Sequence, residues 1–150
     1  MNNIEQHVTS LALSKRLHEL GIKKKSVFSY VAFENPPYGI CKPADVTDDR
    51  WDIYLNTTRD KCPPDYYVTA YLASELGEFL PTEIPPKSGS GSYKELTILH
   101  CGGMWFVGYK KENGWVLPIA IEPNECEARA KMLIHLIEEG IVKVEDLNDE

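Results

Sequence analysis

Hydrophobic and polar positions in the last third of the chain predict a run of strands followed by a helix. Three short runs rich in β-branched and aromatic residues are separated by Gly102-Gly103 and Asn113-Gly114, which supply the positive φ angles of tight hairpin turns. The runs are Glu95 to Cys101, Met104 to Lys110 and Trp115 to Glu122. Together they predict an antiparallel β-meander.

A helix is predicted directly after the meander. Asn124 is a favoured N-cap residue, and Glu127 stands three positions later in capping-box spacing. Gly140, followed by Ile141, is typical of a left-handed helix end with its hydrophobic contact. We therefore expect a helix between Asn124 and Gly140.

The first half of the chain alternates helical and extended patterns. Thr9 or Ser10 precedes leucines at near-helical spacing that end at Gly21-Ile22, which predicts a helix over about residues 10–20. A second, short helix is predicted from Leu72 to Leu80, where Pro81 stops it. The predicted strands are Ser26 to Phe33, Trp51 to Leu55 and, from the weakest pattern, Tyr66 to Tyr71.

The fold class that these elements predict is α+β, in one domain over residues 1–150. We expect an antiparallel meander of four or five strands with the N- and C-terminal helices packed on one face, since 150 residues supply one core and not two. Residues 81–93 are rich in Pro, Gly and Ser, a composition that buries little, and are expected to form a flexible loop.

The last strand of the meander is apolar on both sides. Alternation along the strand gives one side with Trp115, Leu117, Ile119 and Ile121, and the other with Val116, Pro118 and Ala120. A sheet without a polar side needs a second cover, from helices or from another subunit, so we expect a homo-oligomer that meets through the second of these sides. Because Pro118 has no amide hydrogen, this strand is expected to lie at an edge or to be unpaired there.

Composition and charge narrow the functional classes. The formal net charge of −7 disfavours general nucleic-acid binding, which normally needs a basic face. No apolar stretch reaches membrane-spanning length and no signal peptide is recognisable, so we expect no membrane partner and a cytoplasmic protein.

The sequence offers no catalytic residue, metal site or cofactor site that we would assign. The four cysteines include no C-x-x-C pair, and free thiols in a reducing compartment explain them. His100 and Cys101 are adjacent on a strand, so their side chains are expected on opposite faces and cannot form a dyad. Glu75 and Glu78 are expected on the solvated side of the short helix.

Two segments resemble the signature stretches of a family of small proteins of phages and prophages of gut bacteria. These are Ala73 to Pro81 and Glu127 to Gly140, and a leucine-rich first helix and the stretch Trp105 to Tyr109 add to the likeness. The resemblance carries over no catalytic residue. It implies an accessory protein of a phage, in the cytoplasm of the bacterial host, of the kind that binds and neutralises host factors.

Three functions stay open. The first is a binding protein acting by occupancy, as a counter-defence protein that sequesters a nucleotide-like signal or blocks a host protein. The second is a structural or assembly accessory, and the third is a small hydrolase without a recognisable motif. A nucleotide would need cations and a stacking surface near the loop from Lys87 to Lys94. The candidate ligand-binding residues are Lys94, Trp105, Tyr109, Lys110 and Arg129.

Overall fold

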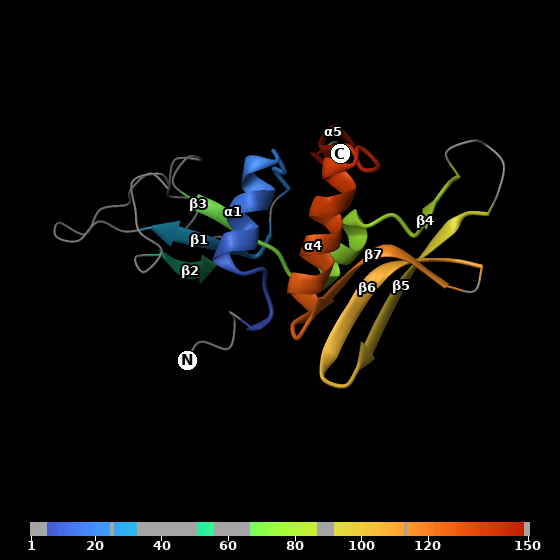
Figure 1. Ribbon diagram of the computed structural model, residues 1–150. Coiled ribbons are helices and arrows are strands. Elements are labelled where there is room, and N and C mark those ends of the chain that lie inside the picture. Colours follow the sequence, from blue (N-terminus) through green and yellow to red (C-terminus); the bar gives the residue numbers. More distant parts are fainter. Residues whose placement is uncertain are drawn as a thin grey trace, which may run out of the picture.

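The chain folds into two antiparallel sheets joined by helices, as the computed structural model shows (Figure 1). The structure describes residues 6–24, 26–32, 51–55, 67–86, 92–112 and 114–148. Helices and antiparallel strands both contribute, so the predicted α+β class is confirmed. The predicted strands divide between the two sheets and do not join in one.

The first sheet has three strands in the order β2-β1-β3. They are β1 (Phe28–Ala32), β2 (Trp51–Leu55) and β3 (Tyr67–Ala70), so all three predicted front strands are present. Helix α1 (Leu11–Glu19) packs against β3. A small apolar cluster that includes Tyr30 and Val68 fills the space between them.

The second sheet has four strands in the order β4-β5-β6-β7. They are β4 (Glu83–Ile84), β5 (Lys94–Cys101), β6 (Met104–Lys111) and β7 (Gly114–Glu122). The last three form the predicted meander. Val107 in β6 lies directly opposite Ile98 in β5 and Ala120 in β7, which fixes the register of the sheet.

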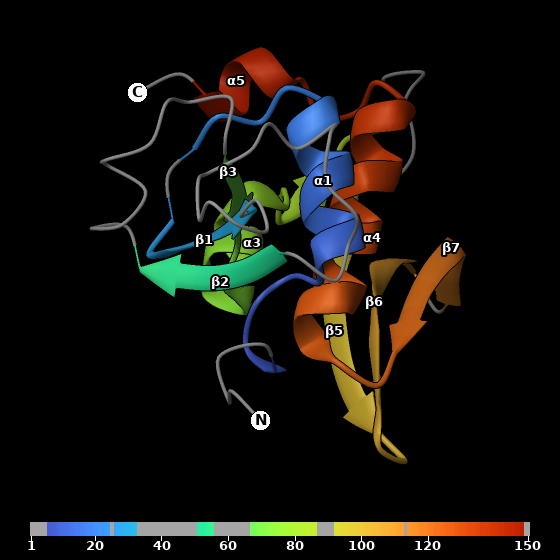
Figure 2. The same cartoon turned by 90° about the vertical axis from the view of Figure 1, so that its left-hand side faces the viewer.

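Helix α4 (Glu125–Glu138) is the centre of the molecule. It packs against β6 and β7 of the second sheet, and also against α1 and against α3 (Ala73–Phe79). Figures 1 and 2 both show α1 and α4 side by side. The short helix α5 (Val144–Asn148) follows α4 in the chain. Leu17, Leu76, Val107 and Leu133, from four different elements, are fully buried in this main core.

The helix ends follow the local sequence rules. The Ser10 hydroxyl accepts a hydrogen bond from the amide of Leu13, and the Asn124 side chain accepts from the amides of Cys126 and Glu127. Gly21 and Gly140 have φ angles of +96° and +75°, the left-handed conformation that ends a helix. The predicted caps and the predicted helix ends are therefore confirmed, but the predicted capping box is not formed, because the Glu127 carboxylate accepts from the amide of Ser10.

Residues 6–10 form a clasp between the front of the chain and its later parts. The carbonyls of Gln6 and His7 accept hydrogen bonds from the side chains of Asn124 and Cys126. The amide of Thr9 donates to the carbonyl of Tyr71, and Val8 forms an isolated bridge with Leu72. This segment holds α1, α3 and α4 to one another.

The segment predicted as a flexible loop that buries little contains a strand. Residues Glu83–Ile84 form β4 and pair with the start of β5, and Ile84 is only 8% exposed. The proline-rich composition of this segment gave no indication that the side chain of Ile84 packs in the core. Residues 87–91 of the predicted loop lie outside the described residues.

Candidate functional site

Strand β6 carries three of the five candidate ligand-binding residues and divides them between its two faces. Side chains alternate along a strand, so Trp105 and Tyr109 lie with the buried Val107 on the face that α4 covers. Lys110 lies on the opposite face. The structure therefore does not bring these three together around one ligand.

Tyr109 is a core residue. It is 4% exposed, and its hydroxyl donates a 2.7 Å hydrogen bond to the carbonyl of Pro81. Burial raises the pKa of Tyr109 well above its ordinary value. Its ring offers no free stacking surface to a ligand.

The two candidate lysines lie away from Trp105. Lys94 begins β5, whereas the residue of β5 opposite Trp105 is His100, six positions and so about 20 Å further along the strand. The ammonium group of Lys110 lies 4.8 Å from the ring centroid of Trp115, a cation–π contact on the other face of the sheet. Neither lysine can serve a ligand held at Trp105.

Arg129 joins two helices. Its guanidinium lies 2.7 Å from the carboxylate of Glu125 one turn earlier, and it also lies against Gly77 of α3, where a larger residue would meet it. Its Nε atom is buried and has no hydrogen-bond partner among the described residues. Since its charge is already paired, Arg129 has a structural role.

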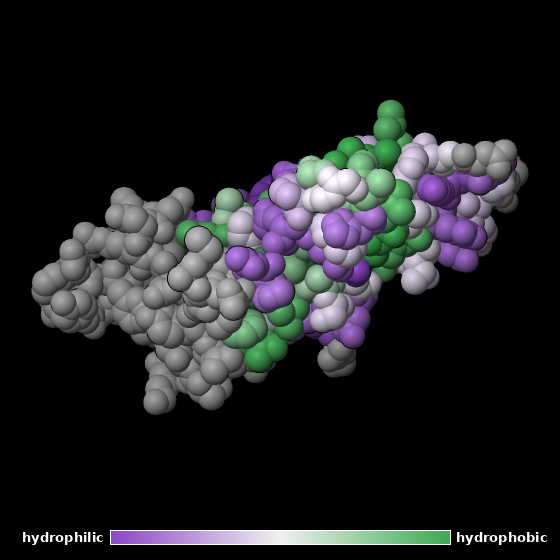
Figure 3. Space-filling model, turned by 90° about the horizontal axis from the view of Figure 1, so that it is seen from below, coloured by the Kyte–Doolittle hydropathy of each residue, from purple (hydrophilic) through white to green (hydrophobic). Residues whose placement is uncertain are grey.

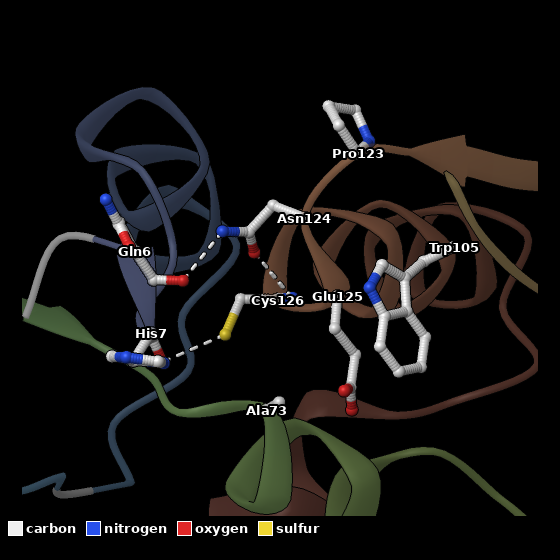
Figure 4. Close-up of a pocket in the computed structure, with 8 residues that line it drawn as sticks. All are labelled: Gln6, His7, Ala73, Trp105, Pro123, Asn124, Glu125 and Cys126. Carbon is white, nitrogen blue, oxygen red and sulfur yellow. Dashed lines mark hydrogen bonds between the residues drawn. The ribbon is translucent and has the colours of Figure 1, made fainter. Parts of the chain in front are cut away.

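A pocket of about 450 Å³ lies beside Trp105, where the clasp meets the start of α4 (Figure 4). The indole ring stacks on His100, with ring centroids 4.3 Å apart and planes 5° from parallel. The lining residues are Gln6, His7, Ala73, Trp105, Pro123, Asn124, Glu125 and Cys126.

The chemistry of this pocket does not suit a nucleotide. The lining includes Glu125 but no lysine or arginine, and the first amides of α4 are taken by the Asn124 side chain. Burial, with the nearby carboxylate of Glu125, raises the pKa of the Cys126 thiol to about 11, so the thiol is neutral and a poor nucleophile. Phosphate groups would meet a carboxylate and no available cation.

The other face of the four-stranded sheet is open, with apolar side chains at one end and charged ones at the other, and we call it the outer face. Leu99, Phe106 and Ile121 stand directly opposite one another on β5, β6 and β7. Leu99 is 47% exposed and Ile121 is 45% exposed. Further outer-face residues are Glu95, Thr97, Cys101, Met104, Gly108, Lys110, Trp115 and Ile119.

No described helix or strand covers the outer face, because α4 packs on the opposite side of the sheet. The turn of the β5–β6 hairpin reaches past the end of α4 in both ribbon views (Figures 1 and 2). Seen from below, the half of the molecule that holds this sheet shows green apolar atoms beside purple polar ones (Figure 3).

Self-association through Val116, Pro118 and Ala120 requires that side of β7 to be exposed, but it is the side that faces the main core. Ala120 lies opposite Val107 and packs on the main core, and Val116 lies opposite the buried Tyr109. The open side is that of Trp115, Ile119 and Ile121, so the predicted association surface was wrong. Pro118 lies in the irregular stretch between the paired parts of β7, which is the edge strand, as predicted.

The register of β5 also shows on which face of the sheet His100 and Cys101 each lie. His100 lies opposite Trp105 on the side of α4, whereas Cys101 lies opposite Met104 on the outer face. Their side chains point to opposite faces, as predicted.

Other site chemistry is not found in the part of the chain that the structure describes. There, no three His, Cys, Asp or Glu side chains come together as metal ligands would. In the same residues, every helix is too short or too polar to cross a bilayer. No protein-family model, curated protein or solved structure matches the chain.

Proposed function

We propose that this chain is a binding protein that acts by occupancy and that it captures a partner protein through its outer face. The observation that supports the proposal is the open row Leu99, Phe106 and Ile121. Side chains of this kind gain free energy when a partner removes them from water, at about 25 cal/mol per Å² of apolar area.

The size of the outer face fits a protein partner better than a small molecule. Three eight- or nine-residue strands make a surface of roughly 27 Å by 14 Å, or about 400 Å². Its apolar end, with the row Leu99, Phe106 and Ile121, is an exposed apolar patch of the kind that marks interaction sites on soluble proteins. The row Leu99, Phe106 and Ile121 is open to solvent and is not enclosed, as a small-molecule site usually is.

The alternative of a nucleotide-sequestering protein has less support. Of the five residues expected to bind the ligand, Tyr109 is buried, Arg129 is paired, and Lys110 lies on the face away from Trp105. In the setting that the phage resemblance implies, the partner would be a host protein that is blocked. An assembly role would use the same face with a phage protein as partner.

Site-specific photo-crosslinking in living bacterial cells tests the proposal. A benzophenone amino acid replaces Leu99 in one variant and Ile121 in another, and the exposed Glu145 of α5 in the control. We expect protein adducts, identified by mass spectrometry, from the two outer-face positions and not from the control. Equal adducts from all three positions, or none from the outer face, would contradict the proposal.

A second substitution makes the test specific. With the photoreactive residue at position 121, Leu99→Lys places a charge at the opposite end of the apolar row and should abolish the adduct. Because Leu99 is half-exposed, the same substitution should leave the thermal unfolding temperature nearly unchanged. An adduct that survives Leu99→Lys would mean that the partner does not bind across the face.

A further inference from the structure

The charged end of the outer face holds charges that are not balanced by ion pairs among the described residues. Glu83 on β4 stands directly opposite Glu95 on β5, and like charges in such a pair destabilise a sheet. Lys110 is the next residue across, on β6, but its ammonium lies over Trp115, and the ion pairs between described residues do not include one between Lys110 and Glu95. A negative pair and an exposed cation thus lie side by side.

This arrangement is complementary to itself. A two-fold axis parallel to the strands, passing between β5 and β6 in the plane of contact, lays β5 of one copy over β6 of another. Glu95 then faces Lys110 of the second copy, and Lys110 faces its Glu95, so the charge pair forms twice. The same operation lays Leu99 over Phe106 of the second copy at the apolar end.

The middle of the face is filled by the indole ring of Trp115, which lies over Gly108. Thr97 in β5 lies opposite Gly108 in β6. The two-fold operation therefore places Thr97 of each copy over Gly108 of the other. Gly108 is buried because Trp115 and Ile119 lie over it, so Thr97 of the second copy would pack on the indole ring of Trp115. This contact fits the spacing of about 10 Å that is usual for sheets packed face to face.

We propose that a second copy of this chain covers the outer face when no partner protein is bound. This inference rests on the proposed function, because it concerns the regulation of the same face: each copy blocks the other's binding surface until a partner displaces it. The contact area of about 400 Å² per copy is about half that of a standard stable interface, near 800 Å² per partner. The dimer is therefore weak enough to exchange.

Charge reversal and sedimentation equilibrium from low to high micromolar concentration test the dimer. Glu95→Lys or Lys110→Glu alone places like charges opposite each other twice in the dimer, so each should raise the dimer dissociation constant by roughly tenfold. The double variant restores both pairs and should return the constant close to that of the wild type. Glu145→Lys, the same charge change on α5, is the control and should change it little.

The possible failures are distinguishable. A wild-type protein that stays monomeric at high micromolar concentration would overturn the dimer, while crosslinks from position 99 to another protein would still support the proposed function. A dimer that is indifferent to both the charge reversals and Leu99→Lys uses another surface, and that result also overturns the inference. Crosslinks from position 99 found only between two copies of the chain would support the dimer and contradict capture of another protein.

Discussion

The carboxylate of Glu127 in α4 accepts a 2.7 Å hydrogen bond from the backbone amide of Ser10, the residue that caps α1. In a capping box this carboxylate would turn back to the amide of its own cap, Asn124. It serves the other helix instead. One side chain thus fixes the start of α1 against the start of α4.

Glu127→Ala should destabilise the protein by about 1–2 kcal/mol, because it leaves the partly buried amide of Ser10 without its charged acceptor. Chemical denaturation of the variant and the wild type measures the difference. Glu139→Ala, at the exposed end of the same helix, is the matched control and should cost less than about 0.5 kcal/mol. An equal loss in both variants would show that the contact with Ser10 contributes nothing.

Gly77→Ala should not give the stabilisation of about 1 kcal/mol that alanine usually brings to a helix. A Cβ atom at this position would meet the guanidinium of Arg129 and push it off Glu125. In an Arg129→Ala background the space is free, and the same substitution should then stabilise. A double-mutant cycle measures the coupling, which we expect at roughly 1–2 kcal/mol; additive effects within about 0.5 kcal/mol would contradict it.

Stability should fall as pH rises from 9 to about 11, in part because of Cys126. Burial raises the thiol pKa from 9.0 to about 11 in the folded protein, so the unfolded chain loses this proton first. The unfolded state then binds fewer protons than the folded state, and stability decreases with pH across this interval.

Cys126→Ser isolates that contribution. Serine cannot ionise here and can still donate to the carbonyl of His7, so the variant should lose less stability over the same pH interval. Tyr109, whose pKa burial also raises, acts equally in both proteins and cancels in the comparison. If the wild type and Cys126→Ser lose the same free energy of unfolding between pH 9 and about 11, the assignment to Cys126 is contradicted.

The elements that the sequence predicted well depend on near neighbours in the chain. Asn124, Gly140 and the Gly102-Gly103 turn act on backbone atoms within a few residues, so their chemistry is visible in a short window. The division of the strands into two sheets depends on which strands pair, and β1 pairs with β2 and β3 across long separations that no local pattern records.

Side chains with distant partners were also hidden. Glu75 was expected to face solvent, yet its carboxylate accepts hydrogen bonds from the amide of Leu72 at 2.8 Å and from the hydroxyl of Ser26 at 2.6 Å. The first partner is three residues away and could have been predicted as a cap. The second lies 49 residues away, and only the fold brings it close.

The prediction that Trp105 and Lys110 share one site was wrong, and strand geometry alone could have shown this. Trp105 and Lys110 are five positions apart on one strand, and an odd spacing puts side chains on opposite faces. The choice between the two apolar sides of β7 was beyond local reasoning. It depends on α4 covering the side of Val107 and Ala120, which is a tertiary contact.

The clasp at residues 6–10 sets an order of events during synthesis. Their partners at Tyr71 and Leu72 are synthesised some 60 residues later, and those at Asn124 to Glu127 are synthesised 117 to 119 residues later. The bond between Ser10 and Glu127 spans 117 positions of the chain. The amide of Ser10 therefore gains its charged acceptor only after α4 has been synthesised, so this contact forms later than contacts within the preceding helices and hairpins.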